Sequence, residues 1–327
     1  MRQLLALLPL LACAREPAIG LAPTKERAVD VVTPGWEQIP TSDGPAARTT
    51  QMVFDTARNR IVLFGGFGDP PGSGLDDTWI WNGSAWTELQ PKHRPPARAA
   101  AAMVYDAARD RVVLFGGARP AGGVYGDTWE FDGADWVEAH PAVSPSPRWS
   151  PAFAWDATNQ RTTLFSGWIG DGSGLDTWSY DGRSWELIAD AGGPGKEGGY
   201  PIATFDPRTG RTAMLTDEIV DGQSVAHLWW FDGLHWTEQA LSVLPSHPGQ
   251  TVLGSHSTYG LVQYGGIGDG GRLWTFDGAT PHLRQLIPAP AAVNAQALVS
   301  DPAQGRLLLF GGGGEDGRRR DELWELR

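Results

Sequence analysis

The chain has almost no cysteine and no apolar run long enough to span a membrane as a helix. Its 327 residues include a single cysteine, Cys13, so no disulfide can form within the chain. The most apolar run, residues 4–12, is much shorter than the roughly 20 residues that a membrane-spanning helix needs. Any folded core must therefore be held together by packing and hydrogen bonds alone.

Positive charge is also scarce. Lys and Arg number 26 against 38 Asp and Glu, which gives a formal net charge of -12. A nucleic-acid-binding surface needs clustered Lys and Arg to neutralise phosphates. The one basic run, residues 318–320, is short and is typical of a solvated loop. We therefore expect no nucleic-acid partner.

Recognisable catalytic and metal-binding motifs are missing as well. The chain has no His-Glu-x-x-His sequence, no nucleophile elbow and no phosphate-binding loop that opens a helix. Its seven histidines are scattered without the spacing of metal ligands. We predict no metal, no cofactor and no assignable catalytic residue.

Glycine and tryptophan, by contrast, are abundant, with 43 and 16 residues. Both belong to a unit seen in residues 98–138, which recurs about every 50 residues. The unit contains a small apolar stretch, a short turn and a β-branched run that ends at Gly116 and Gly117. An aromatic strand, an Asp132-Gly133 hairpin and a final strand follow. This pattern predicts a four-stranded antiparallel meander.

The unit occurs six times. Equivalent positions at the end of the second strand are occupied by Phe64, Phe115, Phe165, Leu215, Tyr264 and Phe310. The third strand carries a tryptophan in every unit, at Trp79, Trp129, Trp178, Trp229, Trp274 and Trp324. An outer tryptophan recurs at Trp86, Trp136, Trp185 and Trp236.

The glycine doublet and the paired aromatics resemble the kelch repeat family, and the resemblance covers residues 36–327. It implies a β-propeller, and six units imply six blades. The sixth unit ends directly after its third strand, whereas Trp36-Glu37 matches the outer-strand pattern of Trp86 and Trp136. We therefore predict an all-β fold, a six-bladed kelch-type β-propeller over residues 35–327. The N-terminal strand is expected to close it by pairing into the last blade, which removes an exposed strand edge.

The N-terminal residues predict export from the cytoplasm. Residues 1–14 have the short positive start and apolar centre of a signal peptide, and residues 15–34 are expected to be a tether. Residues 10–13 resemble a bacterial lipobox, in which Cys13 would carry the lipid. Residues 12–14 also fit an ordinary small-x-small cleavage site. We prefer lipidation at Cys13, and either route predicts an extracytoplasmic protein, membrane-anchored, secreted or periplasmic.

Loop lengths predict which face of the disc binds a partner. The long connections join strands two and three of a unit, or one unit to the next. In a meander these two kinds of loop emerge on the same edge. Because binding residues concentrate on loops above a rigid scaffold, we expect this long-loop face to be the binding surface.

The repeat pattern fails most in units three and four, and departures from a local rule tend to mark function or strain. The candidate ligand-binding residues are Arg148, Trp149, Trp168, Tyr200, Asp217 and Glu218. Aromatic faces with carboxylates and an arginine could stack on and hydrogen-bond a sugar or another polar ligand. The alternative is a degenerate repeat whose aromatics pack between blades. For Arg48, Arg98 and Arg148, which open units one to three, we favour structural hydrogen bonds to carbonyls and carboxylates.

These observations predict a monomeric, non-catalytic binding module for a protein or a glycan. The alternative is a carbohydrate-active enzyme with its site on blades three and four, because some bacterial kelch proteins are sialic-acid epimerases. Other kelch-like propellers are copper oxidases that use a cysteine cross-linked to a tyrosine. This chain has no cysteine besides Cys13, which excludes that chemistry.

Overall fold

The computed structural model describes residues 30–31, 35–69, 73–170, 172–189, 193–194, 200–220, 223–241, 251–265, 272–277, 280–285, 290, 293–294, 297–314 and 316–327. These residues contain strands and turns and no helix. The predicted signal peptide, with Cys13, lies outside the described residues, as do residues 15–29 and 32–34 of the predicted tether.

The strands form six sheets in chain order. Sheet one contains β3 (Thr49–Asp55), β4 (Arg60–Gly68), β5 (Ser73–Trp81) and β6 (Trp86–Leu89). Sheet two contains β7 (Ala102–Asp106), β8 (Arg111–Ala118), β9 (Val124–Phe131) and β10 (Trp136–Ala139). Sheet three contains β11 (Ala152–Asp156), β12 (Arg161–Phe165), β13 (Thr177–Tyr180) and β14 (Trp185–Ala189).

The second half of the chain repeats this plan. Sheet four contains β15 (Ile202–Asp206), β16 (Arg211–Val220), β17 (Gln223–Phe231) and β18 (Trp236–Gln239). Sheet five contains β19 (Thr251–His256), β20 (Gly260–Gly265), β21 (Leu273–Asp277) and β22 (Thr280–Gln285). Sheet six contains β24 (Ala297–Asp301), β25 (Arg306–Phe310), β27 (Leu323–Leu326) and β2 (Trp36–Ile39), while β23 (Val293–Asn294) and β26 (Gly313–Gly314) form a separate small ladder.

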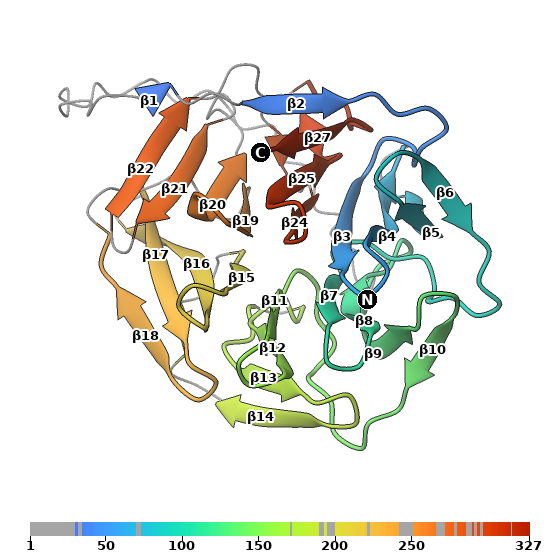
Figure 1. The fold of residues 1–327 in the computed structure, drawn as a ribbon. Coiled ribbons are helices and arrows are strands. Elements are labelled where there is room, and N and C mark those ends of the chain that lie inside the picture. Colours follow the sequence, from blue (N-terminus) through green and yellow to red (C-terminus); the bar gives the residue numbers. More distant parts are fainter. Residues whose placement is uncertain are drawn as a thin grey trace, which may run out of the picture.

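The six sheets form a closed ring. The first strand of each sheet contacts the first strands of the sheets on either side, and β24 of sheet six contacts β3 of sheet one. Figure 1 looks along the axis of this ring, with β2 in blue beside β27 in red. The fold is a six-bladed β-propeller, as the repeats predict. Each sheet is one blade, and blades one to six follow the numbering of the sheets.

Ring closure occurs as predicted. Strand β2 pairs antiparallel with β27, so that Trp36 lies opposite Leu326 and Ile39 lies opposite Leu323. Within the predicted tether, Asp30–Val31 form an additional short strand, β1, which pairs in parallel with β22 at the outer edge of blade five. That second pairing has no signal in the repeat pattern.

The predicted equivalence of the six units is confirmed by strand register. In each blade the equivalent residue of the second strand pairs with the residue just before the recurring third-strand tryptophan. The six pairs are Phe64↔Thr78, Phe115↔Thr128, Phe165↔Thr177, Leu215↔Leu228, Tyr264↔Leu273 and Phe310↔Leu323. Equivalent positions of the repeat therefore occupy the same place in the strand ladder of every blade.

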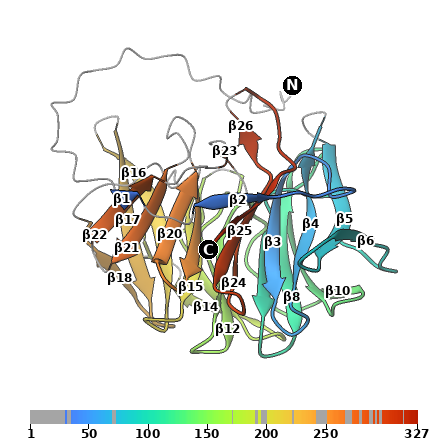
Figure 2. The same cartoon turned by 45° about the horizontal axis from the view of Figure 1, so that its top comes forward.

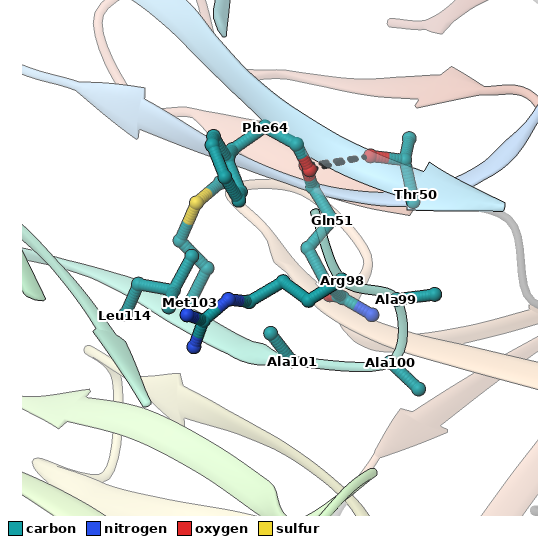
Figure 3. A pocket seen from close by; sticks show the side chains of 10 residues that line it. Thr50, Gln51, Phe64, Arg98, Ala99, Ala100, Ala101, Met103 and Leu114 are labelled. Carbon is teal, nitrogen blue, oxygen red and sulfur yellow. Dashed lines mark hydrogen bonds between the residues drawn. The ribbon is translucent and has the colours of Figure 1, made fainter. Parts of the chain in front are cut away.

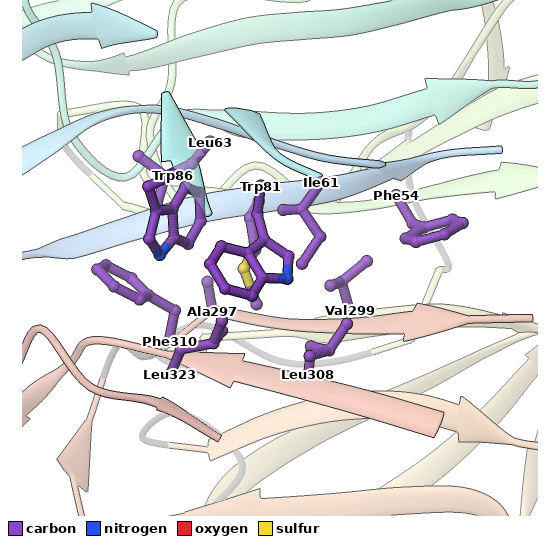
Figure 4. Packing of buried hydrophobic residues seen from close by; sticks show 11 residues of the cluster. Phe54, Ile61, Leu63, Trp81, Trp86, Ala297, Val299, Leu308, Phe310 and Leu323 are labelled. Carbon is purple, nitrogen blue, oxygen red and sulfur yellow. The ribbon is translucent and has the colours of Figure 1, made fainter. Parts of the chain in front are cut away.

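Aromatic contacts between neighbouring blades make up much of the core. The second-strand aromatic of one blade packs against the outer tryptophan of the next, as in Phe115 and Trp185, whose ring centroids lie 5.1 Å apart. Figure 4 shows the corresponding contact between Phe310 of blade six and Trp86 of blade one. Blade four has Leu215 in place of the second-strand aromatic, and blade five, which follows it, has no outer tryptophan. Both residues of this contact are therefore missing at the same interface.

The outer tryptophans also form a hydrogen bond across blades. The indole N–H groups of Trp136, Trp185 and Trp236 each donate over 3.0 Å to a threonine hydroxyl in the third strand of the preceding blade: Thr78, Thr128 and Thr177, respectively. In blades five and six that threonine is replaced by Leu273 and Leu323. The facing indole N–H groups, those of Trp36 and Trp86, are buried without a hydrogen-bond partner in the described structure.

Antiparallel order within the blades separates the two kinds of loop. Short turns between strands one and two lie on one edge of the disc, and the longer connections lie on the opposite edge, which is the predicted long-loop face. Figure 2 shows this separation from the side, with the β24–β25 turn at the bottom and β26 at the top. The propeller thus presents one plain face and one elaborated face.

Candidate functional site

Arg148 is part of the structure of blade three and is not a surface residue. Its side chain is fully buried, and its two terminal nitrogens donate to the Asp176 carboxylate over 2.6 and 2.9 Å. Further bonds to Ser146 and to the Ser166 carbonyl occupy the remaining N–H groups. Because all five guanidinium N–H groups are used, none is left for a ligand. Arg148 is therefore removed from the predicted ligand-binding set, and the structural interpretation holds.

The same arrangement occurs in blades one and two. Arg98 bonds both oxygens of Asp127, and Arg48 bonds Asp77. In all three blades this aspartate also accepts a hydrogen bond from the indole of the tryptophan two residues later. Burial raises the pKa of Asp127, but the hydrogen bonds and charge of Arg98 outweigh burial and hold that pKa below its usual range. The Asp127 carboxylate therefore stays ionised at neutral pH and keeps its bonds to Arg98 and Trp129. We call the arginine, the aspartate and the tryptophan of each of these blades its triad.

The glycine doublet of one blade accommodates the main chain of the arginine that opens the following blade. The Gly117 N–H of blade two donates over 2.9 Å to the Arg148 carbonyl of blade three. A Cβ at Gly116, where φ is +66°, would lie only 2.4 Å from that carbonyl oxygen. The doublet is therefore required where one blade docks on another.

Blade four lacks both the doublet and the triad. Thr216, Asp217 and Glu218 replace the glycine region, and the β16–β17 ladder continues regularly to the Val220↔Gln223 pair. His227 stands where blades one to three have the triad aspartate. Its Nδ1 lies 2.7 Å from Oε1 of Glu238, and its Nε2 lies 3.8 Å from Oε2 of Glu218. We call Glu218, His227 and Glu238 the His227 cluster.

Strand register places the His227 cluster on one face of blade four. Glu218 lies opposite Val225, two residues before His227, and Glu238 lies opposite Trp229, two residues after it. Trp229 packs against a cluster formed by Ala152 and Phe165 of blade three and Met214 of blade four, so this face is turned toward blade three. The Trp229 indole nitrogen and the His227 Nε2 are buried without a hydrogen-bond partner among the described residues.

Asp217 does not belong to this cluster. It lies opposite Ala226, the alternate position of the ladder, and the structure describes its main chain only. The adjacent pair Asp217 and Glu218 therefore occupies alternate register positions, as expected for neighbouring residues of a strand. Glu218 alone joins His227.

The three predicted aromatic residues lie together at the long-loop edge of blades three and four. Trp149 and Trp168 form a two-residue bridge, with main-chain hydrogen bonds of 3.1 and 2.9 Å. The Trp149 ring contacts that of Tyr200 from blade four, with centroids 5.9 Å apart. Trp168 is 36% exposed and Tyr200 is 45% exposed. We call these three residues the aromatic cluster.

Sequence reasoning missed His227 and Glu238 as site residues. His227 had a signal, because it interrupts the Asp-x-Trp pattern of the first three units. Glu238 had none, because the outer strands of blades one and two carry glutamates, Glu88 and Glu138, at the same position. Its relation to His227 depends on the pairing of β17 with β18.

A small cavity lies elsewhere, between the inner strands of blades one and two. Its volume is about 10 Å³, and its lining includes Thr50, Phe64, Arg98, Met103 and Leu114 (Figure 3). This is room for one water molecule, far below the several hundred Å³ typical of small-molecule sites. It is too small to be the candidate site.

Comparison with protein-family models and with curated proteins finds no match for this chain. Among the described residues, no helix has the length and apolar character that crossing a membrane requires. The described part of the chain also contains no group of three or more His, Cys, Asp or Glu residues arranged to hold a metal ion.

Proposed function

We propose that this protein is a kelch-type propeller that acts outside the cytoplasm as a non-catalytic binding module. The glycine doublets and paired aromatics support the kelch assignment, and the predicted signal peptide supports the location. The proposed partner is a glycan or a protein surface bound at the long-loop face. The exposed aromatic rings at this edge favour a glycan, because sugars offer apolar faces for stacking.

One observation carries this proposal: the repeat does not require the aromatic cluster. In blade two the equivalent two-residue bridge is formed by Ala99 and Ala118, with main-chain hydrogen bonds of 3.2 and 2.8 Å. A blade can therefore form this bridge with two methyl groups. Large aromatics at such positions in blade three, one of them 36% exposed, are better explained by a ligand than by folding.

The test combines a glycan array with melting temperatures. Trp149→Ala and Trp168→Ala reproduce the alanines of blade two, so both variants should fold with nearly unchanged melting temperature and lose binding. The control is Trp79→Ala, since Trp79 packs against the core between blades six and one and bonds Asp77. That variant should lose stability first. If the blade-three variants prove as destabilised as Trp79→Ala, the two tryptophans are packing residues and the proposal is wrong.

The proposed location rests on Cys13. If Cys13 carries a lipid, the wild-type protein should sediment with membranes and Cys13→Ser should appear in the soluble fraction. Mass spectrometry of the mature N-terminus provides the independent measurement. A soluble wild-type protein that begins beyond Cys13 would instead support ordinary cleavage.

A second candidate function is a carbohydrate-active enzyme such as an epimerase, and one observation favours it. The His227 cluster places an imidazole 2.7 Å from one carboxylate and 3.8 Å from another, an arrangement that can transfer protons. Catalysis would require turnover of a bound sugar that His227→Gln abolishes without weakening binding. Binding without turnover by the wild type would leave the binding module as the function.

A further inference from the structure

The hairpin between the third and fourth strands of blade one differs in chemistry from its equivalents. In blades two, three and four this hairpin turns through an Asp-Gly pair, at Asp132-Gly133, Asp181-Gly182 and Asp232-Gly233. Blade one turns through Asn82-Gly83 instead, which is the only Asn-Gly pair in the sequence. An asparagine side chain is open to attack by the main-chain nitrogen that follows it, and glycine hinders this attack least because it has no side chain.

The turn holds Asn82 in the same way as it holds the aspartates. The Asn82 Oδ1 accepts the main-chain N–H groups of Ser84 and Ala85, each over 2.9 Å. In blade two the Asp132 carboxylate accepts the N–H groups two and three residues further on, over 2.8 and 2.9 Å. The same two donors therefore bind an amide in one blade and a carboxylate in the other. At Asn82 they also withdraw electrons from the side-chain carbonyl, which makes its carbon a better electrophile.

The hairpin of blade one is also uncovered. In blades two to four, a side chain of the preceding blade lies against the hairpin glycine. A Cβ on that glycine would lie 2.5 Å from Arg58 in blade two, 2.2 Å from Arg109 in blade three and 2.4 Å from Asn159 in blade four. At Gly83 no described atom other than those of its chain neighbours lies within 4 Å of this place, and residues 82–85 are all exposed. The main chain of this hairpin can therefore move as the reaction requires.

We propose that Asn82 is a site of spontaneous deamidation in the folded protein. The Gly83 nitrogen bonds to Cγ of Asn82, the bond from Cγ to the side-chain nitrogen breaks, and ammonia leaves with the proton from Gly83. One water molecule then opens the resulting five-membered ring. Opening at Cγ produces an aspartate, whereas opening at the main-chain carbonyl carbon produces an isoaspartate. Either product adds one negative charge to the plain face, and water is the only reactant.

The aspartate product fits the turn that is already present. In the equivalent hairpins, the main-chain N–H groups of Asp135 and His235 hold the pKa of Asp132 and Asp232 below the usual range. An aspartate at position 82 would meet the same kind of donors, so it would be ionised and bound by charge-assisted hydrogen bonds. An ionised carboxylate is a poor electrophile. The product is therefore retained, and the Asp-Gly hairpins of the other blades resist the same cyclisation.

The experiment ages the purified, folded full chain at pH 8. Ion-exchange chromatography follows acidic species, and mass spectrometry of the peptide containing residue 82 locates the change. We expect an acidic species to accumulate with time, ammonia to be released and conversion to be confined to Asn82. The internal control is Asn159, which is also exposed in a turn but is followed by Gln160, so it should stay unchanged. If residue 82 stays an asparagine in the folded chain while the urea-unfolded chain converts, the fold protects it and the proposal is wrong.

Two variants test the site and the fit of its product separately. Asn82→Gln should form no acidic species, because its longer side chain would have to close a larger ring. Asn82→Asp should elute with the aged protein from the start and keep the melting temperature of the wild type. An acidic species that persists in Asn82→Gln would overturn the assignment to Asn82. A clearly lower melting temperature in Asn82→Asp would overturn the fit of aspartate to the turn.

Discussion

At the residue scale, one kind of side chain makes different interactions in different blades. The outer tryptophan donates to a threonine hydroxyl where the preceding blade has one, as Trp185 does to Thr128. Where leucine replaces threonine, as at Leu323, the facing indole N–H of Trp86 stays buried without a partner in the described structure. An unsatisfied buried donor costs free energy, so the interfaces on either side of blade six are expected to be the weaker ones.

We expect Thr128→Val to reduce the free energy of unfolding by roughly 1–3 kcal/mol, because it leaves the buried Trp185 N–H unpaired at almost constant volume. Denaturant titration measures the change. The control is Thr162→Val in blade three, since the Thr162 hydroxyl is already buried without a partner and its loss should be neutral or favourable. Equal effects of the two substitutions would show that the indole bond contributes nothing.

At the scale of the element, the turn between the first and second strands depends on one buried acceptor. In blade two the Asp106 carboxylate accepts the N–H groups of Ala108 and Arg109. Blade five has His256 at this position, and its Nδ1 accepts the N–H groups of Thr258 and Tyr259 over 3.1 and 3.2 Å. The histidine therefore reproduces the turn only in the neutral form, with its proton on Nε2.

This turn predicts a pH dependence of stability that is specific to blade five. Burial lowers the pKa of His256, so the unfolded chain takes up a proton more readily than the folded one. The contribution of His256 is fully present above its unfolded pKa of about 6.5 and is lost as pH falls through the lower folded value. Melting temperatures at pH 8 and pH 5 should differ less in His256→Asp, which restores the acceptor of the other blades.

His235→Gln is the control for this prediction, because the His235 side chain is 79% exposed. It should leave the difference between pH 8 and pH 5 as in the wild type. If His256→Asp shows the same pH difference as the wild type, protonation of the blade-five turn does not limit stability in that range.

At the scale of the whole molecule, the ring is held closed where the two ends of the propeller meet. Strand β2 completes blade six, and Trp36 is buried against Tyr264 of blade five, with centroids 4.8 Å apart. On the inner side, the Arg48 carbonyl accepts the Gly312 N–H over 2.9 Å, which ties blade one to blade six. The blades are thus one cooperative unit, because no blade buries both of its faces alone.

We expect a variant that begins at Thr41 to be strongly destabilised relative to one that begins at Gly35. The shorter variant lacks β2, so it loses the buried Trp36, worth about 3–5 kcal/mol as a large aromatic, and it exposes the edge of β27. Thermal unfolding and light scattering should show a lower melting temperature and aggregation. Similar melting temperatures for both variants would contradict closure by β2.

Much of the candidate site could be located from the sequence, because it lies where the repeat fails. Trp149 and Trp168 stood out as aromatics of unit three and Tyr200 as the residue that opens unit four, and the structure brings the three together. At the position of Trp168, blade one also has an aromatic residue, Phe67, which pairs with Thr49. Arg148 could not be judged in the same way. Whether an arginine faces solvent or an aspartate depends on which residue the fold brings next to it. Here that residue is Asp176, which is 28 residues away in the sequence.

The sequence by itself determined the strands, the equivalence of the six units and the pairing that closes the ring, because each of these depends on local patterns repeated at a fixed interval. Only the tertiary structure decided what the exceptions do. His227 meets Glu218 and Glu238 through strand register, His256 replaces an aspartate through its ring nitrogen, and β1 joins blade five. These contacts join residues whose relation no repeat encodes, since they arise from the packing of one particular blade against its neighbours.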